Sequence, residues 1–425
     1  MTELVVRGGE VVDAGGRRRA DVLVADAVIR AVGPDLEVPS GATVLDAGGC
    51  VVAPGLVDLH AHLRQPGREE AETVETGARA AALGGYTAVV AMPNTEPPLD
   101  SAGAVREVLA LGRGAAVEVC VAGAITVGRA GERLAPMAEL AALGVHLFTD
   151  DGSGVQDGAL MRRALDYARG LGVTLAQHCE DEKLADGGAM HEGAWSSRLG
   201  VPGMPAVAEE AMVARDVALA RLTGARLHFL HLSTAGSVDL VRRAKAEGLA
   251  VTAEAAPHHL VLTDAAVAGF DPVFRVSPPL RGDDDVAAVR AGLADGTIDA
   301  IATDHAPHAP EAKDVPFAEA PPGMLGLETA LAVALSVAPL ERVLAVMSWR
   351  PAAIAGLSDR HGGPVVEGRP ANLCVIDPAA TWQVDAGRLA SRSRNTPYDG
   401  WELTGRVRHT VRAGEPVVVD AEAAR

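Results

Sequence analysis

Histidines and aspartates follow five apolar segments of this 425-residue chain, at the points where buried strands are expected to end. They are His60 and His62, Asp150 and Asp151, His178, His231, and Asp304 with His305. Imidazole and carboxylate groups are the ligands that zinc takes in proteins, and a His-x-His pair at a strand end directs both rings to one side. A lone strand histidine is more often a packed core residue. A series at successive strand ends predicts a metal site.

The size of this set predicts two metal ions. Five or six of these residues are expected to act as ligands, and six exceed what one tetrahedral zinc uses, so two divalent ions about 3.5–4 Å apart are expected, with a carboxylate and a hydroxide between them. Such a centre hydrolyses or forms amide bonds, because one metal polarises the carbonyl, the hydroxide attacks, and a nearby carboxylate carries the proton to or from nitrogen. Of the other histidines, His228, His258, His259 and His305 are candidates for supporting or packing roles, and His146, His191, His361 and His409 are predicted at the surface.

Short β-branched segments alternate with alanine-rich helical stretches through the middle of the chain. Eight strands are expected, at Val51–His60, Tyr86–Pro93, Val117–Ile125, Val145–Asp151, Thr174–Cys179, Arg226–Leu232, Val251–Ala255 and Ala300–Asp304. Helices are expected between them, among others at Thr73–Leu83, Leu134–Leu143, Leu160–Leu171, Ala206–Leu222 and Ser237–Glu247, and later at Leu327–Ser336. Eight such units predict an α/β fold, a closed (β/α)8 TIM-type barrel with its catalytic side chains at the carboxyl ends of the strands. No Gly-x-Gly-x-x-Gly motif follows the first strand, which weighs against a dinucleotide-binding fold.

Both ends of the chain have the alternation of apolar and polar residues that is typical of short strands. The segments are Leu4–Gly8, Asp21–Val32 and Thr43–Asp46 at one end, and Ala371–Asp377, Val407–Val411 and Pro416–Asp420 at the other. We therefore expect residues 1–54 and 360–425 to form one small, sandwich-like β domain, and residues 55–359 to form the barrel.

The charge and hydropathy of the chain exclude several classes of protein. The chain has 56 acidic and 38 basic residues, which gives it a net charge of −18. This charge repels phosphate backbones and anionic lipid, so nucleic acid and membranes are not expected partners. No apolar segment approaches the roughly 18 residues that span a bilayer, and Met1–Val6 lacks the basic start of a secretory signal. The four cysteines form no CxxC pair and are typical of reduced, buried thiols. We expect a cytoplasmic protein.

Longer motifs around these residues match a known pattern over essentially the whole chain. They are Pro54-Gly55-Leu56-Val57-Asp58-Leu59-His60-Ala61-His62-Leu63-Arg64, Ala91-Met92-Pro93-Asn94-Thr95, Phe148-Thr149-Asp150-Asp151-Gly152, His178-Cys179-Glu180, His231-Leu232-Ser233, Thr303-Asp304-His305-Ala306-Pro307-His308, Gly326-Leu327-Glu328-Thr329 and Asn395-Thr396-Pro397-Tyr398. In these segments the sequence resembles the amidohydrolase superfamily and, within it, the class I dihydroorotases of pyrimidine biosynthesis. The resemblance implies a hydrolase acting on a cyclic amide, which reversibly cyclises N-carbamoyl-L-aspartate to (S)-dihydroorotate.

The resemblance also implies a role for each predicted ligand. One metal would be held by His60, His62 and Asp304, the other by His178 and His231, with Asp151 as the bridge. Asp304 would be the proton shuttle, and both metals would be zinc. Asp151 is preferred to Asp150 on the family pattern alone, because strand alternation does not say which of two adjacent side chains faces the lumen.

Substrate binding requires a cation and hydrogen-bond donors, since both substrates carry carboxylates. Arg64 offers a planar fork for a carboxylate, and Asn94 and His308 occupy positions that the family uses, as does His62. Ser277, Pro322 and Gly323 are also candidates for substrate binding, although at these two positions the sequence departs from the family pattern. Ser277 stands where the family usually has asparagine, and Pro322-Gly323 stands where it often has Phe-Gly, so only the Gly323 N–H is available as a backbone donor there.

Two alternative functions stay open at this stage. Dihydropyrimidinases, hydantoinases and allantoinases share the barrel but generally bridge their metals with a carboxylated lysine, whereas the three lysines here (Lys183, Lys245 and Lys313) do not end the fourth strand. An inactive homologue that serves as a structural partner of aspartate transcarbamoylase would lose metal ligands, and none is lost. A homodimer and an assembly with aspartate transcarbamoylase are the partners considered besides the small-molecule substrate, and the sequence does not choose between them.

Overall fold

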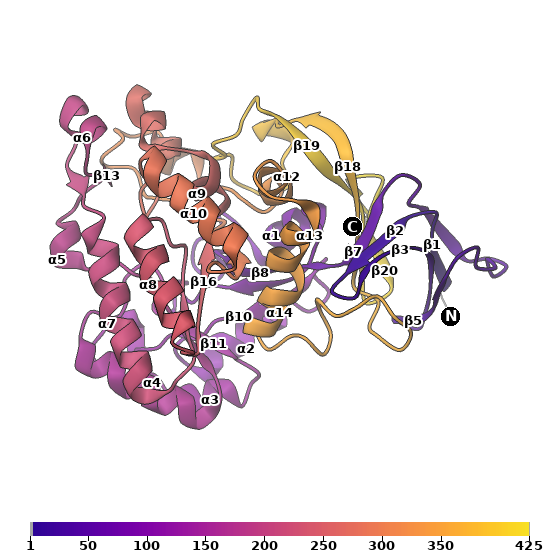
Figure 1. The fold of residues 1–425 in the computed structure, drawn as a ribbon, viewed down its shortest axis with the longest axis horizontal. Coiled ribbons are helices and arrows are strands. Elements are labelled where there is room, and N and C mark those ends of the chain that lie inside the picture. The colour runs from indigo at the N-terminus through magenta and orange to yellow at the C-terminus, as the bar shows by residue number, and fades with distance from the viewer. Residues whose placement is uncertain (1–2, 425) are drawn as a thin grey trace.

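Eight parallel strands form the centre of the structure, a computed structural model that describes residues 3–424 (Figure 1). They are β8 (Leu56–Ala61), β9 (Tyr86–Ala91), β10 (Glu118–Val121), β11 (Leu147–Thr149), β12 (Thr174–Gln177), β15 (Leu227–Phe229), β16 (Val251–Ala255) and β17 (Ala300–Ile301). Hydrogen bonding gives the orders β10-β9-β8 and β11-β12-β15-β16-β17. Parallel bridges between Gly123 and Phe148 and between Ala61 and His305 join these two groups of strands. The predicted α/β barrel is confirmed.

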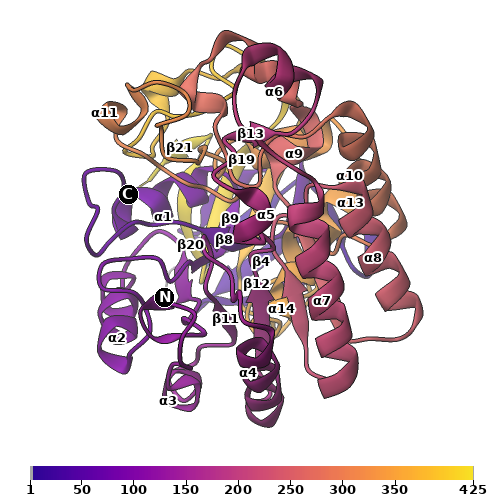
Figure 2. The same ribbon diagram turned by 90° about the vertical axis from the view of Figure 1, so that its left-hand side faces the viewer.

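Helices surround these strands, as Figure 2 shows. The longer ones are α1 (Val74–Leu83), α2 (Ala102–Leu111), α4 (Gly158–Leu171), α7 (Val207–Thr223), α8 (Ala235–Ala246) and α10 (Asp283–Asp295), and the shorter ones include α3 (Met137–Ala141), α12 (Ala330–Leu335), α13 (Leu340–Leu344) and α14 (Arg350–Ile354). Helix α1 begins where the Thr73 side chain accepts the Thr76 N–H, and α4 ends at Gly172 with a φ of 69°. Among residues 3–424, no helix has the length and apolar character needed to cross a membrane.

The strands of the barrel are buried on both faces, as parallel strands covered by helices must be. Every residue of β8, β9, β11, β12, β15 and β17 is buried. A large apolar cluster, which includes Tyr86, Phe148 and Phe229, packs the strands against their helices. Polar side chains on such strands are therefore withdrawn from water, and each requires a partner.

Two further sheets bring both ends of the chain together beside the barrel (Figure 1). One has the order β5-β4-β1-β6 and the other the order β21-β20-β19-β18-β7-β2-β3. Their strands are β1 (Glu3–Arg7), β2 (Glu10–Asp13), β3 (Gly16–Arg19), β4 (Asp21–Ala25), β5 (Val28–Gly33), β6 (Thr43–Asp46), β7 (Val51–Pro54), β18 (Leu373–Gln383), β19 (Glu402–Arg412), β20 (Glu415–Val419) and β21 (Glu422–Ala423). The boundaries of the small β domain, whose outermost residues Met1, Thr2 and Arg425 lie outside the described part, stay a prediction.

The first expected strand, Val51–His60, is two strands in the structure. Strand β7 pairs with β2 and β18 in the terminal sheet, whereas β8 pairs with β9 in the barrel. They meet at Gly55, where an added Cβ would lie 2.2 Å from Thr87 Cγ2. A larger residue does not fit there, so glycine lets the chain pass closely against β9 as it leaves one sheet for the other.

Candidate active site

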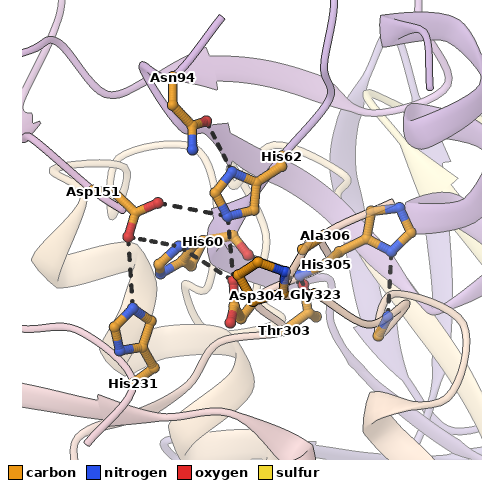
Figure 3. A network of polar contacts seen from close by, with 12 residues as sticks. His60, His62, Asn94, Asp151, His231, Thr303, Asp304, His305, Ala306 and Gly323 are labelled. Carbon is orange, nitrogen blue, oxygen red and sulfur yellow. Dashed lines mark hydrogen bonds and ion pairs between the residues drawn. The ribbon is translucent and has the colours of Figure 1, made fainter. Parts of the chain in front are cut away.

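Four imidazoles and a carboxylate form two groups at the carboxyl ends of the barrel strands. Figure 3 shows His60, His62 and His231 around Asp151. The candidate ligand atoms of His60, His62 and Asp151 lie within 4.8 Å of one another, and so do those of Asp151, His178 and His231. All five residues are buried, and Asp151 belongs to both groups. The structure thus brings together the side chains that the sequence placed at the ends of four different strands.

The Asp151 carboxylate lies between the two groups. Its Oδ1 is 3.5 Å from His60 Nε2, 3.4 Å from His178 Nδ1 and 3.5 Å from His231 Nε2, and its Oδ2 is 3.5 Å from His62 Nε2. These separations exceed those of good N–H···O hydrogen bonds. Two ligands that are each about 2.0–2.1 Å from one tetrahedral ion lie roughly 3.3–3.4 Å apart. The spacing therefore fits atoms that share a cation.

Asp304 completes the set on the side of His60 and His62. Its Oδ1 lies 3.2 Å from His62 Nε2 and 3.5 Å from His60 Nε2. The preceding residue, Thr303, donates to the buried Asp58 carboxylate through its N–H at 2.8 Å and its Oγ1 at 2.6 Å. Asp58 on β8 thereby anchors the short strand β17 at the point from which Asp304 projects.

Backbone strain accompanies this cluster. Arg64, His231 and Asp304 have φ values of 62°, 29° and 46°, in the left-handed region that L-residues rarely adopt. Such conformations cost about 1–3 kcal/mol each, and they persist where the surrounding structure holds a side chain in a required direction. All three residues belong to the predicted site.

Asp150 and Asp151 are distinguished by their contacts. The Asp150 carboxylate accepts the N–H groups of Ile125 and Thr126 at 2.8 and 3.1 Å, and it also accepts from Thr126 Oγ1. It therefore holds the loop that follows β10 and faces away from the imidazoles. Asp151 is the aspartate that faces them, as the family pattern implies.

The electrostatics of the cluster suit a cation. His60 Nε2 is buried and has no hydrogen-bond partner among the described residues, although two carboxylates lie near it. Burial lowers the pKa of His60, but the charges of Asp151 and Asp304 outweigh burial and raise it well above its usual value. Burial raises the pKa of Asp151, but His60, His178 and His231 outweigh burial and hold it well below its usual value. The four imidazoles and two carboxylates fit a pair of divalent ions.

Glu254, near the end of β16, is a functional candidate that the sequence reasoning missed. Its Oε1 lies 2.8 Å from His60 Nδ1, its Oε2 lies 2.9 Å from His228 Nε2, and His228 Nδ1 lies 2.8 Å from Thr252 Oγ1. An ionised carboxylate only accepts hydrogen bonds, so His60 carries a proton on Nδ1, and as a metal ligand it would bind through the lone pair of Nε2. The signal in the sequence was a carboxylate inside the apolar segment Val251–Ala255, where an unpaired charge would be costly.

Two of the histidines predicted to have supporting or packing roles contact other polar groups of the chain. His305 Nε2 lies 3.2 Å from the buried Glu72 carboxylate, and His259 Nε2 lies 3.0 Å from the Pro278 carbonyl. The prediction that His361 and His409 lie at the surface is wrong, because each is only 1% exposed. His361 Nε2 lies 2.8 Å from Glu118 Oε2, and His409 Nε2 lies 3.0 Å from the Asp46 carbonyl, so partners distant in sequence cover both rings.

Arg64 is buried beside the cluster, with 8% of its surface exposed. Its Nε donates to the Pro307 carbonyl at 3.0 Å, and its Nη2 lies 3.5 Å from His308 Nε2. Within residues 3–424 it forms no ion pair, and burial together with the Arg68 charge lowers its pKa to about 10. A buried guanidinium without a carboxylate is a site prepared for an anionic ligand.

Asn94 lies beside His62. The Asn94 Oδ1 is 2.9 Å from His62 Nδ1 and accepts its proton, which leaves the amide N–H groups of Asn94 for a ligand.

Pro322 and Gly323 shape this region through His308. The Pro322 carbonyl lies 2.8 Å from His308 Nε2, and a Cβ on Gly323 would also lie 2.8 Å from that atom. The Gly323 N–H, which was expected to be available for substrate, instead donates to the Arg275 carbonyl at 2.9 Å. Glycine is needed there because its φ of 145° and the space beside His308 admit no side chain.

The three lysines lie elsewhere. The Lys183 side chain is 89% exposed, Lys245 Nζ is paired with Asp299, and Lys313 Nζ donates to the carbonyls of Pro272, Arg275 and Pro321. None of the contacts that these lysines make in the described part of the chain involves a candidate metal ligand. The group that lies between the two sets of candidate ligands is the Asp151 carboxylate.

Known proteins resemble this chain over its whole length. It is 50% identical to the dihydroorotase of Streptomyces coelicolor, over 99% of this chain and all of that one. It is 51% identical to the dihydroorotase of Mycobacterium tuberculosis, over 96% of this chain and 97% of that one. The chain belongs to the dihydroorotase family. The family model described as dihydro-orotase-like matches residues 49–237, which include the dihydroorotase-family motifs from β8 to His231.

Solved structures of related barrels share the fold of this dihydroorotase-family chain. An L-hydantoinase from Arthrobacter aurescens superposes with a TM-score of 0.90 at 26% identity and covers all of this chain and 98% of its own. A D-hydantoinase superposes with a TM-score of 0.87 at 23% identity, a likeness that shows the fold alone. The amidohydrolase barrel with its accessory β sheets is therefore common to both groups of enzymes.

Proposed function

We propose that this chain is a class I dihydroorotase, which interconverts N-carbamoyl-L-aspartate and (S)-dihydroorotate in the de novo synthesis of pyrimidines. The proposal is supported by the dihydroorotase relatives and by a site that offers both a binuclear metal cluster and a cation for the substrate. The observation that carries the substrate class is the buried Arg64 guanidinium, which has no carboxylate partner within residues 3–424. Neutral cyclic amides have no group that needs it.

In this proposal His60, His62 and Asp304 would hold one zinc ion, His178 and His231 would hold a second, and Asp151 would contribute to both. When bound, the two ions polarise the reacting carbonyl and lower the pKa of a water molecule toward neutrality. The Asp151 carboxylate is expected to bridge the ions without a carbon dioxide adduct on lysine, because the three lysines contact other parts of the chain. A homodimer and an assembly with aspartate transcarbamoylase stay predictions.

Asp304 is proposed to move the proton. Burial raises its pKa, but His60, His62 and His231 outweigh burial and hold the pKa below its usual value, so the carboxylate is ionised at neutral pH. It can accept a proton from the attacking water and deliver it to the ring nitrogen as the amide bond breaks, and it reverses this transfer during cyclisation. The anchor of Thr303 on Asp58 keeps this carboxylate in place.

Arg64, Asn94 and His308 are proposed to orient the substrate. The Arg64 guanidinium donates hydrogen bonds to the carboxylate that dihydroorotate carries on its ring, and the free amide N–H groups of Asn94 add further hydrogen bonds. His308 lies against the fork, with its Nε2 held by the Pro322 carbonyl. Pro322 and Gly323 therefore act by placing His308.

The test compares the ring opening of dihydroorotate with that of dihydrouracil, which has the same ring without the carboxylate. The proposal predicts a kcat/KM for dihydroorotate that is higher by orders of magnitude, because dihydrouracil leaves the Arg64 charge buried and unpaired. Equal or faster opening of dihydrouracil would instead favour the dihydropyrimidinase alternative.

A further inference from the structure

Ser277 contacts a protein carboxylate. Its Oγ donates to Glu180 Oε2 at 2.7 Å, and the same Oε2 lies 3.5 Å from His178 Nε2. His178 Nδ1, on the other side of the ring, faces Asp151 and His231 at 3.4 and 3.0 Å. A chain of polar contacts therefore runs from Ser277 through Glu180 to the outer face of a candidate metal ligand.

The position of Ser277 had been expected to bind substrate, as the asparagine of the family pattern does. A hydroxyl has one proton, and here that proton is directed to Glu180. Because this proton is directed to Glu180 Oε2 at 2.7 Å, Ser277 has none to donate to a substrate carboxylate.

We propose that Ser277 is a positioning residue, which holds Glu180 so that Glu180 orients His178 for the metal that His178 and His231 share. The arrangement resembles that of Glu254 with His60, since in each case a carboxylate faces the ring nitrogen that points away from the cluster, at 2.8 Å for Glu254 and at a looser 3.5 Å for Glu180. Such outer carboxylates fix the tautomer and the direction of the ring, and they increase its basicity. The Glu180 side chain is 24% exposed, whereas that of Glu254 is 1% exposed. The orientation of the Glu180 side chain therefore depends more on an additional hydrogen bond, which Ser277 donates.

The inference rests on the proposed metal centre but not on the identity of the substrate. Its test is therefore metal affinity, measured by competition between the purified protein and a chromogenic zinc chelator. Glu180→Gln should weaken the more loosely held zinc by about 10- to 100-fold. Ser277→Ala should weaken it by about 3- to 10-fold, the effect of one lost hydrogen bond. Ser277→Thr keeps the hydroxyl and should return the affinity toward that of the wild type.

A double variant distinguishes an effect of Ser277 that passes through Glu180 from independent effects of the two residues on zinc affinity. If Ser277 acts through Glu180, Ser277→Ala combined with Glu180→Gln should bind zinc no more weakly than Glu180→Gln alone. Ser336→Ala is the matched control, because this serine donates to the Val333 carbonyl on α12 and should leave zinc affinity unchanged. The KM for dihydroorotate should change less than threefold in Ser277→Ala, while kcat falls with zinc occupancy.

Other outcomes would overturn the proposal. Wild-type zinc affinity in Ser277→Ala with a KM raised tenfold or more would show that Ser277 contacts the substrate. Wild-type zinc affinity together with unchanged kinetics in Ser277→Ala would show that Ser277 has no positioning role. Additive losses of zinc affinity in the double variant would show that Ser277 does not act through Glu180. The zinc measurement needs no substrate, so its result stands even if dihydroorotate is not opened.

Discussion

The contact between Glu254 and His60 gives a prediction whose size follows from the structure. Glu254→Gln keeps the shape of the side chain and removes its charge. The new amide can accept the proton of His60 Nδ1 with its oxygen, and it then presents N–H to His228. Thr252 can turn its hydroxyl and allow His228 to change tautomer, so the fold should survive.

The expected loss is therefore in metal binding. Replacing a charge-assisted hydrogen bond by a neutral one costs about 1 kcal/mol. The loss of a buried negative charge close to a divalent ion adds to this, so zinc affinity at the His60 site should fall by about 10- to 100-fold. Thermal unfolding of the metal-free protein should change by only a few degrees, whereas the stabilisation that zinc adds should be much reduced.

Competition with a zinc chelator measures this loss, and unfolding of the metal-free and zinc-loaded protein separates it from damage to the fold. Glu328→Gln is the control, because among residues 3–424 the half-buried Glu328 carboxylate accepts only backbone N–H groups, those of Ala390 and Ser391. Wild-type zinc affinity in Glu254→Gln would refute the argument that Glu254 sets the tautomer of His60.

Four further predictions follow from the same contacts. Arg64→Lys should raise the KM for dihydroorotate by at least tenfold in steady-state assays, because a point ammonium cannot replace the fork, and a KM within twofold of wild type would contradict that role. Asp304→Asn should lower kcat by orders of magnitude even where metal analysis finds zinc retained, and an unchanged kcat would exclude the proton shuttle. Replacing Lys183, Lys245 and Lys313 together by arginine should leave two ions bound, whereas Asp151→Ala should lose the paired centre, and a carbon dioxide adduct on any of the three lysines in a mass spectrum would contradict the bridge. Burial raises the pKa of Glu118, but the contacts with His361 and Arg360 outweigh burial and lower the pKa to about 2. The ionised Glu118 therefore stabilises the fold at pH values above the ordinary carboxyl pKa, and this stabilisation is lost as the pH falls toward 2. Urea unfolding should find Glu118→Gln about 1–2 kcal/mol less stable than wild type at pH 7, with a smaller gap at pH 3, and an equal gap at both would contradict the assignment.

The sequence predicted the barrel and much of the cluster because burial makes polar residues conspicuous. His178 and His231 follow segments that otherwise have the composition of fully buried strands, so their positions could be recognised without knowledge of the fold. Glu254 was missed because it stands alone within its segment, and its partners His60 and His228 lie on other strands.

Other features depend on contacts that no local pattern contains. His361 is buried by Glu118, which lies 243 positions away in the chain. The division of the first strand at Gly55 depends on which sheet offers hydrogen bonds to each half, and both halves are fully buried. The engagement of the Ser277 hydroxyl by Glu180 required the loops after β12 and β16 to be placed together.

The most direct test of the account is to measure dihydroorotate ring opening and zinc content on the same preparation, as ions are removed by chelation and then returned. The account predicts two zinc ions per chain at full activity, a loss of turnover as the paired centre is emptied, and recovery when zinc is restored. Full activity in protein that contains no metal, or no ring opening in protein that holds two ions per chain, would contradict it.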